Sequence, residues 1–277
     1  MDLSTVLTIA GSDSSGGAGI QADLKTMTLN GVYGMSAITA LTAQNTTGVQ
    51  AVHDVPAEFV AQQIDSVFSD IRPQAVKIGM VSQPDIIEAI VDRLVAHRAS
   101  NIVVDPVMVS TAGSTLISQA AIGVLTEKLF PLATAITPNI LEAQEILHTA
   151  AIDTPAKMEA AAAILGEQFG VAVLIKGGHS VADANDVLFQ PAEHAEDRQL
   201  TWFHGQRIDN HNAHGTGCTL SSAIAANLAK RKALPDAIEA AKDYLTRALA
   251  AGLDLGAGDG PLDHAWELRT LGSAFAD

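Results

Sequence analysis

The chain has 277 residues, enough for one large α/β domain or two small ones, and its 48% of hydrophobic residues are ample for a core. Aromatic residues make up only 4%, so the core must be built mainly from aliphatic side chains, which favours a parallel sheet covered by helices on both faces. A formal net charge of −15 argues against non-specific binding to nucleic acid or to anionic lipid.

Cysteine content and hydropathy narrow the class of protein further. Cys218 is the only cysteine, which excludes an internal disulfide and fits a reducing compartment. No segment approaches the ~18–20 consecutive apolar residues of a membrane span, and no signal-peptide pattern precedes the first strand-like segment. We therefore expect a soluble, cytoplasmic protein without a membrane or nucleic-acid partner.

Strand-like apolar runs alternate with amphipathic helical patterns along the whole chain. Predicted strands cover residues 4–10, 36–44, 75–80, 101–108, 134–138 and 171–175, with a hairpin of 187–189 and 200–204. Predicted helices begin at residues 20 and 139, lie within 117–132, and cover 56–71, 83–97, 154–169, 220–229 and 235–253. No linker or repeat interrupts this order, which predicts one doubly wound α/β domain over residues 1–277.

A glycine-rich segment, 11–19, joins the first predicted strand to the first predicted helix. This is a common α/β ligand-binding arrangement, but the spacing is not that of the dinucleotide fingerprint, so a nicotinamide-dependent oxidoreductase is only a distant alternative. Asp13 and Asp23 are the polar groups that the segment could present to a ligand. Asp23 fits a solvated position in the first helical turns equally well.

The segment 214–219 carries the strongest chemical signal. Gly215 and Gly217, on either side of Thr216, would let backbone N–H groups approach a ligand, and the helix that follows directs its positive end to the same point, as in a phosphate site. Cys218 stands there too, and a helix N-terminus lowers a thiol pKa from ~8.5. An anion site beside a proton acceptor indicates phosphoryl transfer to an alcohol. A tight turn with an inert buried cysteine has the same sequence, so both interpretations stay open.

Further polar residues follow the ends of predicted strands, and such ends share one rim of a parallel sheet. Gln44 suits the edge of an aminopyrimidine or pyridine, or else caps a turn. Asp105 is a carboxylate at a strand end. Asn139 and Glu142 form either a capping box or two oxygen ligands for Mg²⁺. Lys176 directly follows an apolar run and is placed to pair with a polyphosphate.

Seven segments together resemble the hydroxymethylpyrimidine/phosphomethylpyrimidine kinases of thiamine biosynthesis. They are residues 10–25, 39–46, 77–80, 105–108, 137–139, 176–179 and 214–219. The resemblance runs in order from about Thr5 to about Leu249. It implies a ribokinase-like three-layer α/β/α sandwich with a central, mostly parallel sheet, and a homodimer. It also implies MgATP as donor and 4-amino-5-hydroxymethyl-2-methylpyrimidine as acceptor, phosphorylated first to the monophosphate and then to the diphosphate.

The same resemblance implies which residues meet the acceptor. Gln44 would read the aminopyrimidine edge. Gly11, Asp23, Met80 and Val107 would help to wall the acceptor pocket. A pyridoxal or pyridoxine kinase is the nearest alternative, since related enzymes phosphorylate a hydroxymethyl group on a flat six-membered ring. A non-catalytic regulator that binds the pyrimidine is an alternative of another class.

On the donor side, the resemblance implies that Asp105 and Glu142 organise Mg²⁺. Lys176, Asn139 and Thr216 would contact ATP, with Lys176 at the phosphates.

The resemblance assigns the catalytic step to the segment 214–219. Residues 215–217 would form the anion hole, and Cys218 would be the base where many ribokinase-like enzymes have an aspartate. The chain departs from the family at two places. Residues 110–113 lack the lysine that a flap often carries, and Asp259 stands where the family often has a histidine.

Overall fold

The central sheet has eight strands in the order β10-β9-β8-β7-β6-β5-β1-β2. The computed structural model describes residues 3–108, 117–178, 184–192 and 199–273. The strands of this sheet are β1 (Thr5–Ala10), β2 (Tyr33–Ile38), β5 (Ala75–Ile78), β6 (Ile102–Val104), β7 (Ala135–Ile136), β8 (Ala172–Ile175), β9 (Asp186–Gln190) and β10 (Gln199–Phe203). Neighbours from β2 to β8 run parallel, and β9 and β10 are added antiparallel.

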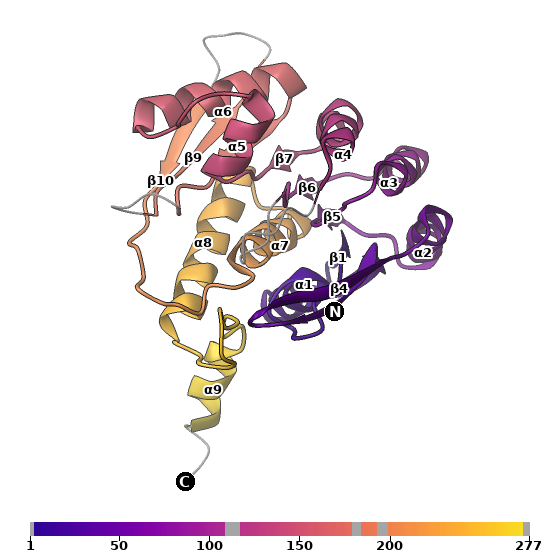
Figure 1. Ribbon diagram of the computed structural model, residues 1–277. Helices are drawn as coiled ribbons and strands as arrows, with labels where there is room; N and C mark the ends of the chain where they lie inside the picture. The colour runs from indigo at the N-terminus through magenta and orange to yellow at the C-terminus, as the bar shows by residue number, and fades with distance from the viewer. Residues whose placement is uncertain (1–2, 109–116, 179–183, 193–198, 274–277) are drawn as a thin grey trace.

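Helices cover both faces of this sheet (Figure 1). The first face is covered by α2 (Ala57–Asp70), α3 (Pro84–Ala96), α4 (Gln119–Val124), α5 (Ile140–Leu147) and α6 (Pro155–Phe169), with the short turns η1 (Leu125–Leu129) and η2 (Phe130–Leu132). The other face is covered by α1 (Gly19–Leu29), α7 (Thr216–Ala229) and α8 (Leu234–Ala250), while α9 (Trp266–Ser273) follows at the C-terminal end. The predicted three-layer α/β/α sandwich is confirmed.

The two faces of the strands differ in side-chain size. In β5 to β8, large aliphatic residues such as Ile78, Val104 and Ile175 point to the layer of α2 to α6. Small residues such as Ala75 and Ala135 point to α7, whose own face is rich in alanine. Alternation along a strand sends successive side chains to opposite faces, so this pattern lets α7 approach the middle of the sheet closely.

Residues 36–44 form parts of two strands rather than the single predicted strand, because the chain leaves the central sheet at Thr39. The Thr39 amide donates to the Ala10 carbonyl (3.0 Å), its carbonyl accepts from Val55 (2.9 Å), and its hydroxyl donates to the Met80 carbonyl (3.0 Å). These bonds end β2 and redirect the chain into β3 (Ala40–Asn45). This strand pairs with β4 (Gly48–Asp54) in a separate two-stranded antiparallel sheet.

Two element boundaries differ from the expectation in ways that matter for the site. Helix α7 begins at Thr216 rather than at residue 220, so that Cys218 lies in its first turn. Strand β6 ends at Val104, which leaves Asp105 directly after it. The flap segment 110–113 lies outside the described residues.

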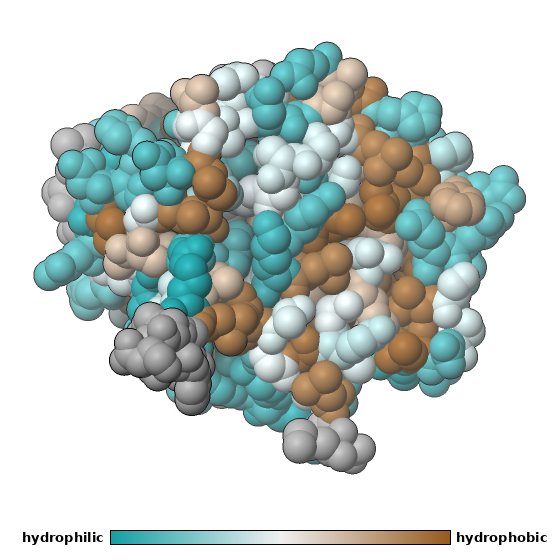
Figure 2. All heavy atoms as spheres, turned by 90° about the horizontal axis from the view of Figure 1, so that it is seen from below, coloured by the Kyte–Doolittle hydropathy of each residue, from teal (hydrophilic) through white to brown (hydrophobic). Residues whose placement is uncertain are grey.

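On the surface, large hydrophobic residues such as Leu41 on β3 and Val52 on β4 are exposed. Figure 2 shows one face of the molecule, where hydrophobic residues gather in patches among polar ones. In the part of the chain that the structure describes, each helix is too short or too polar to cross a membrane.

A buried ion pair ties the sheet to the α1/α7 layer. Lys77 on β5 donates to both carboxylate oxygens of Asp23 on α1 (2.9 Å each), and both side chains are fully buried. The hydroxyls of Thr8 on β1 and Ser222 on α7 also donate to Asp23 (2.6 and 2.7 Å). Burial favours a neutral amine, but the charge of Asp23, supported by that of Asp105, raises the pKa of Lys77 above its ordinary value.

We expect Lys77→Met to destabilise the fold by about 3–5 kcal/mol, because it leaves the Asp23 carboxylate buried without a counter-charge. Urea unfolding followed by circular dichroism measures this. The matched control is Lys157→Met, which removes the exposed Lys157–Asp153 pair (2.7 Å) and should cost no more than about 1 kcal/mol. Equal losses in the two variants would contradict the role given to the buried pair.

Candidate active site

One cavity of about 1240 Å³ lies at the carboxyl ends of the parallel strands. Residues that directly follow those strands line it: Gly11 after β1, Asp105 after β6 and Lys176 after β8. It is also lined by the other expected site residues, apart from Asp23, namely Gln44, Met80, Val107, Asn139, Glu142, Gly215, Thr216, Gly217 and Cys218. The topology therefore brings together residues up to about two hundred positions apart in the chain.

Asp23 is the exception among the expected pocket residues. It is fully buried and does not line the cavity. Its two oxygens accept hydrogen bonds from Lys77, Thr8 and Ser222, so the carboxylate already has partners in the protein interior. The expectation that Asp23 walls the acceptor pocket is therefore wrong in this structure. Sequence spacing placed it on the correct helix but could not show which way the side chain pointed.

The start of α7 is packed against the β1–α1 loop. Gly215 precedes the helix with φ +85°, and a Cβ there would lie 2.0 Å from the Gly17 carbonyl oxygen. Only glycine fits both the conformation and the space. Gly215 has no side chain to cap the first-turn amides, which lack acceptors within a helix, and the Thr216 amide donates to the Ala213 carbonyl (3.3 Å). The Thr216 hydroxyl donates back to the Ala213 carbonyl (2.5 Å), so it does not cap them either.

Charged groups from other strands face this helix start. A Cβ on Gly217 would lie 3.2 Å from Asp105 Oδ2 and 3.4 Å from Lys176 Nζ. Lys176 Nζ donates to Asp105 Oδ1 (2.7 Å), and the hydroxyls of Thr137 and Ser221 also donate to Asp105 (3.2 and 3.4 Å). Backbone amides, an ammonium group and a carboxylate thus lie together at the start of α7, a combination suited to binding a phosphate group.

The cysteine at this helix start has a raised pKa, not a lowered one. Burial raises the pKa of Cys218 to about 11, and the carboxylates of Asp23 and Asp105 add to the shift. The ammonium group of Lys77 and the amide of Gly19 act in the opposite direction but do not outweigh them. The expectation of an acidified thiol at the helix N-terminus is therefore wrong for the protein without ligands. At neutral pH Cys218 is a thiol.

Asn139 and Glu142 form the capping box that their spacing allowed. Asn139 Oδ1 accepts from the Glu142 amide (2.9 Å), and Glu142 Oε2 accepts from the Asn139 amide (2.7 Å). Burial raises the pKa of Glu142 to about 7; Lys176 opposes this shift and the charge of Asp105 adds to it. Both residues also line the cavity, so capping and ligand contact do not exclude each other here.

The cavity residues fit a Mg²⁺ ion held by two carboxylates together with substrate phosphates, rather than one coordinated by protein side chains alone. Among the described residues, no group of three or more His, Cys, Asp or Glu is placed to share a metal ion. Asp105 and Glu142 are hard oxygen donors on the same cavity, and Mg²⁺ is commonly held by one or two carboxylates together with substrate phosphates.

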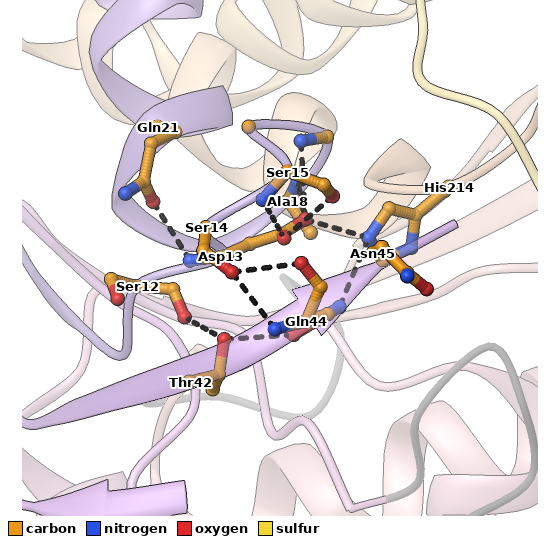
Figure 3. A network of polar contacts seen from close by, with 12 residues as sticks. Ser12, Asp13, Ser14, Ser15, Ala18, Gln21, Thr42, Gln44, Asn45 and His214 are labelled. Carbon is orange, nitrogen blue, oxygen red and sulfur yellow. Dashed lines mark hydrogen bonds and ion pairs between the residues drawn. The ribbon is translucent and has the colours of Figure 1, made fainter. Parts of the chain in front are cut away.

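Gln44 belongs to a polar network that joins β3 to the first loop (Figure 3). The side-chain nitrogen of Gln44 lies 3.3 Å from His214 Nε2, and its Oε1 lies 3.1 Å from the Thr42 hydroxyl. His214 Nε2 lies 2.8 Å from Asp13 Oδ2. Sequence reasoning considered Asp13 as a ligand contact and gave His214 no role. The position of His214 directly before Gly215 was the only signal that could have singled it out.

Asp13 uses both of its oxygens within this network. Oδ1 accepts from the amide and hydroxyl of Ser15 (2.9 and 2.7 Å), and Oδ2 accepts from the amides of Gly17 and Ala18 (3.1 and 2.9 Å). Burial opposes the charge, but the bonds from His214, Ser15 and Ala18 hold the pKa of Asp13 well below its usual range. The carboxylate therefore stays ionised and organises the loop around it.

Comparison with known proteins identifies related enzymes of thiamine biosynthesis. The chain is 49% identical over 94% of its length to the thiamine biosynthesis bifunctional protein ThiED of Geobacter sulfurreducens, and spans about half (52%) of that protein. It is 47% identical to the hydroxymethylpyrimidine/phosphomethylpyrimidine kinase of Streptomyces coelicolor, with 95% of each chain covered.

Solved structures of phosphomethylpyrimidine kinase and of pyridoxal kinase share the fold of this chain. An ADP complex of Bacillus subtilis pyridoxal kinase has a TM-score of 0.87 at 36% identity, covering 97% of this chain and 99% of that one. The phosphomethylpyrimidine kinase family model matches residues 13–263. Because the match takes in every strand of the central sheet except β1 and the whole glycine-rich segment before α7, the chain belongs to the phosphomethylpyrimidine kinase family.

Proposed function

We propose that this chain phosphorylates 4-amino-5-hydroxymethyl-2-methylpyrimidine with ATP, first to the monophosphate and then to the diphosphate, in thiamine biosynthesis. The observation that carries the proposal is the approach of Gly217, at the start of α7, to Asp105 and Lys176. This approach brings hydrogen-bond donors and charged side chains together at a point where a phosphoryl group can be transferred to the acceptor. The full-length Streptomyces relative is named for both phosphorylations. Residues 1–277 would form one kinase domain.

For the donor side, we place the ATP phosphates between the α7 start and Lys176. Backbone N–H groups of residues 215–217 and the ammonium group would hold the charge of the moving phosphoryl group. Asn139 and Thr216, which also line the cavity, would contact the nucleotide. Asp105 and Glu142 would hold Mg²⁺, which neutralises phosphate charge when bound.

For the acceptor side, we place the pyrimidine between Gln44 and the strand ends. Gly11, Met80 and Val107 line the cavity, and a Cβ on Gly11 would lie 2.6 Å from the Met80 methyl carbon. Because glycine has no Cβ, the Met80 side chain can pack against the backbone at Gly11. The hydroxymethyl oxygen would lie near Cys218, which takes its proton late in the transfer. Because the free thiol is protonated, that step depends on the small thiolate fraction.

We expect Cys218→Ala to lower kcat by ~10²–10⁴-fold, the usual contribution of a general base, while ligand affinities change little. The thiolate fraction rises about tenfold per pH unit below a pKa of about 11, so kcat/KM of the unmodified protein should rise from neutral to alkaline pH. The variant should lose that rise. A coupled assay of ADP release between pH 6 and 9 measures both, and full turnover in Cys218→Ala would remove the base assignment.

Gln44→Leu should weaken pyrimidine binding by about 10- to 100-fold while ADP affinity stays within about twofold, because the lost hydrogen bonds belong to the acceptor only. Calorimetric titration with each ligand provides the measurement. Gln62→Leu, an exposed glutamine on α2, is the control and should change neither affinity. Equal losses for both ligands in Gln44→Leu would count against its role in reading the acceptor.

Pyridoxal kinase activity is the second candidate, favoured by the TM-score of 0.87 with Bacillus subtilis pyridoxal kinase. Incubation with MgATP and either acceptor, followed by mass spectrometry of the products, decides between the two. A regulator without catalysis would bind the pyrimidine and form no phosphorylated product.

We also propose a cytoplasmic homodimer. The thiol of Cys218 must remain reduced to act, which fits a reducing compartment. Exposed Leu41, on the face of the β3–β4 sheet opposite the cavity-lining Val52, offers apolar surface for a second copy of the chain. Sedimentation velocity would show whether replacing Leu41 with serine gives a monomer.

A further inference from the structure

The polar network around Gln44 contains a contradiction between donors and acceptors. His214 Nε2 lies near two groups, the Asp13 carboxylate at 2.8 Å and the Gln44 side-chain nitrogen at 3.3 Å (Figure 3). An amide nitrogen only donates and a carboxylate oxygen only accepts. One ring nitrogen cannot donate to Asp13 and accept from Gln44 at the same time.

The Asp13 side of the network decides which role His214 takes. Asp13 Oδ2 already accepts from the amides of Gly17 and Ala18, and Oδ1 accepts from Ser15. A carboxylate held ionised by these donors can only accept from the ring at 2.8 Å. His214 Nε2 therefore carries a proton, in the neutral ring as well as in the imidazolium form, and it needs an oxygen rather than an NH₂ group from Gln44.

The contacts of the Thr42 hydroxyl, at the other end of the Gln44 amide, require the same amide orientation. Its hydroxyl lies 2.9 Å from the Ser12 carbonyl oxygen and 3.1 Å from Gln44 Oε1. The hydroxyl has one proton, and the carbonyl can only accept it. The hydroxyl must then accept from Gln44, which requires the NH₂ group on the Thr42 side. A turn of the amide by 180° about its last side-chain bond satisfies both contacts at once.

We propose that Asp13 and His214 are positioning residues that fix the Gln44 amide with its oxygen toward His214 and its nitrogen toward Thr42. This inference rests on the proposed function, since it concerns how Gln44 reads the acceptor. One lone pair near His214 and one N–H near Thr42 remain for a ligand. An aminopyrimidine has an amino group beside a ring nitrogen. The amino group can donate to the Gln44 oxygen while the ring nitrogen accepts from the Gln44 NH₂ group, so the ring pairs in one orientation only. Pyridoxal has no amino group beside its ring nitrogen and pairs at one point at most.

The network also connects Gln44 to the turn that precedes α7. A Cβ on Gly17 would lie 2.6 Å from the His214 ring, so the ring packs directly on the first loop. The amide of His214 donates to the Gly260 carbonyl (3.2 Å), which fixes the turn before Gly215. His214 therefore both orients the Gln44 amide, which would bind the acceptor, and directly precedes Gly215 at the start of α7.

The kinetic test uses His214→Phe, which keeps a ring and removes the N–H, together with His214→Gln, which keeps an amide donor. We expect His214→Phe to raise KM for the pyrimidine by about 5- to 10-fold, the effect of one hydrogen bond, with KM for ATP within about twofold. The preference for the pyrimidine over pyridoxal in kcat/KM should fall by a similar factor. His214→Gln should recover part of both losses. Thr42→Val should act like His214→Phe, and Thr42→Ser should behave like the unmodified protein.

Two outcomes would overturn the proposal. One is an equal loss for the pyrimidine and pyridoxal in His214→Phe, and the other is a fall in kcat with both KM values unchanged. Thermal unfolding of each variant shows whether a loss reflects folding; if His214→Phe unfolds, the Thr42 pair provides the same comparison.

A measurement on the free protein separates this proposal from the proposed function. Long-range ¹H–¹⁵N spectra of the histidine rings, assigned by comparison with His214→Phe, show whether Nε2 of His214 carries a proton. A protonated Nε2 supports the orientation of Gln44 even if the pyrimidine proves not to be the acceptor. An unprotonated Nε2 refutes the orientation even if the pyrimidine is phosphorylated.

Discussion

The close packing of two backbone segments, the turn before α7 and the β1–α1 loop, is the constraint on which the site depends. At Gly215 a Cβ would collide with the Gly17 carbonyl oxygen, and the positive φ would strain any other residue. This contact brings the amides of α7 to the rim where the parallel strands end. It also places Asp13 within reach of His214 and the Gly19 amide beside the sulfur of Cys218.

The balance of electrostatic effects at Cys218 follows from their magnitudes. A helix N-terminus stabilises a charge by about 0.3–1 kcal/mol, up to ~2 kcal/mol in partly buried geometries, and one pKa unit corresponds to about 1.4 kcal/mol. Burial shifts a pKa by as much as about 3–5 units. Desolvation therefore outweighs the helix, and the carboxylates of Asp23 and Asp105 add to it. A thiol with a raised pKa is poorly ionised at rest, but its thiolate is a stronger base when it forms.

The charged residues around α7 divide between the inside of the protein and the cavity. Lys77 and Asp23 form a closed pair inside, where each satisfies the other and the pair joins β5 to α1. Lys176 and Asp105 form a pair of similar length that opens onto the cavity. Pairing keeps both lysines charged despite burial. Of these two pairs, only the second is placed to exchange a partner with a ligand, so we assign stability to the first and propose a role in phosphate binding for the second.

Periodicity alone was sufficient to predict the layers, because alternation of strands and helices leaves few ways to bury aliphatic side chains on both faces of a sheet. It was also sufficient to place Asp105, Lys176 and Glu142 on one rim, since each follows a strand or begins the next helix. Local pattern could not reveal that the chain leaves the sheet at Thr39, because the bonds that redirect it come from Ala10, Val55 and Met80.

The sequence by itself therefore determined the fold class, the family and the rim on which the chemistry-bearing residues gather. Only the tertiary structure decided that Asp23 points inward and that the pKa of Cys218 rises. It also decided that His214 lies between Asp13 and Gln44. Each of these depends on what surrounds a side chain in three dimensions, and burial and hydrogen-bond partners come from segments far apart along the chain.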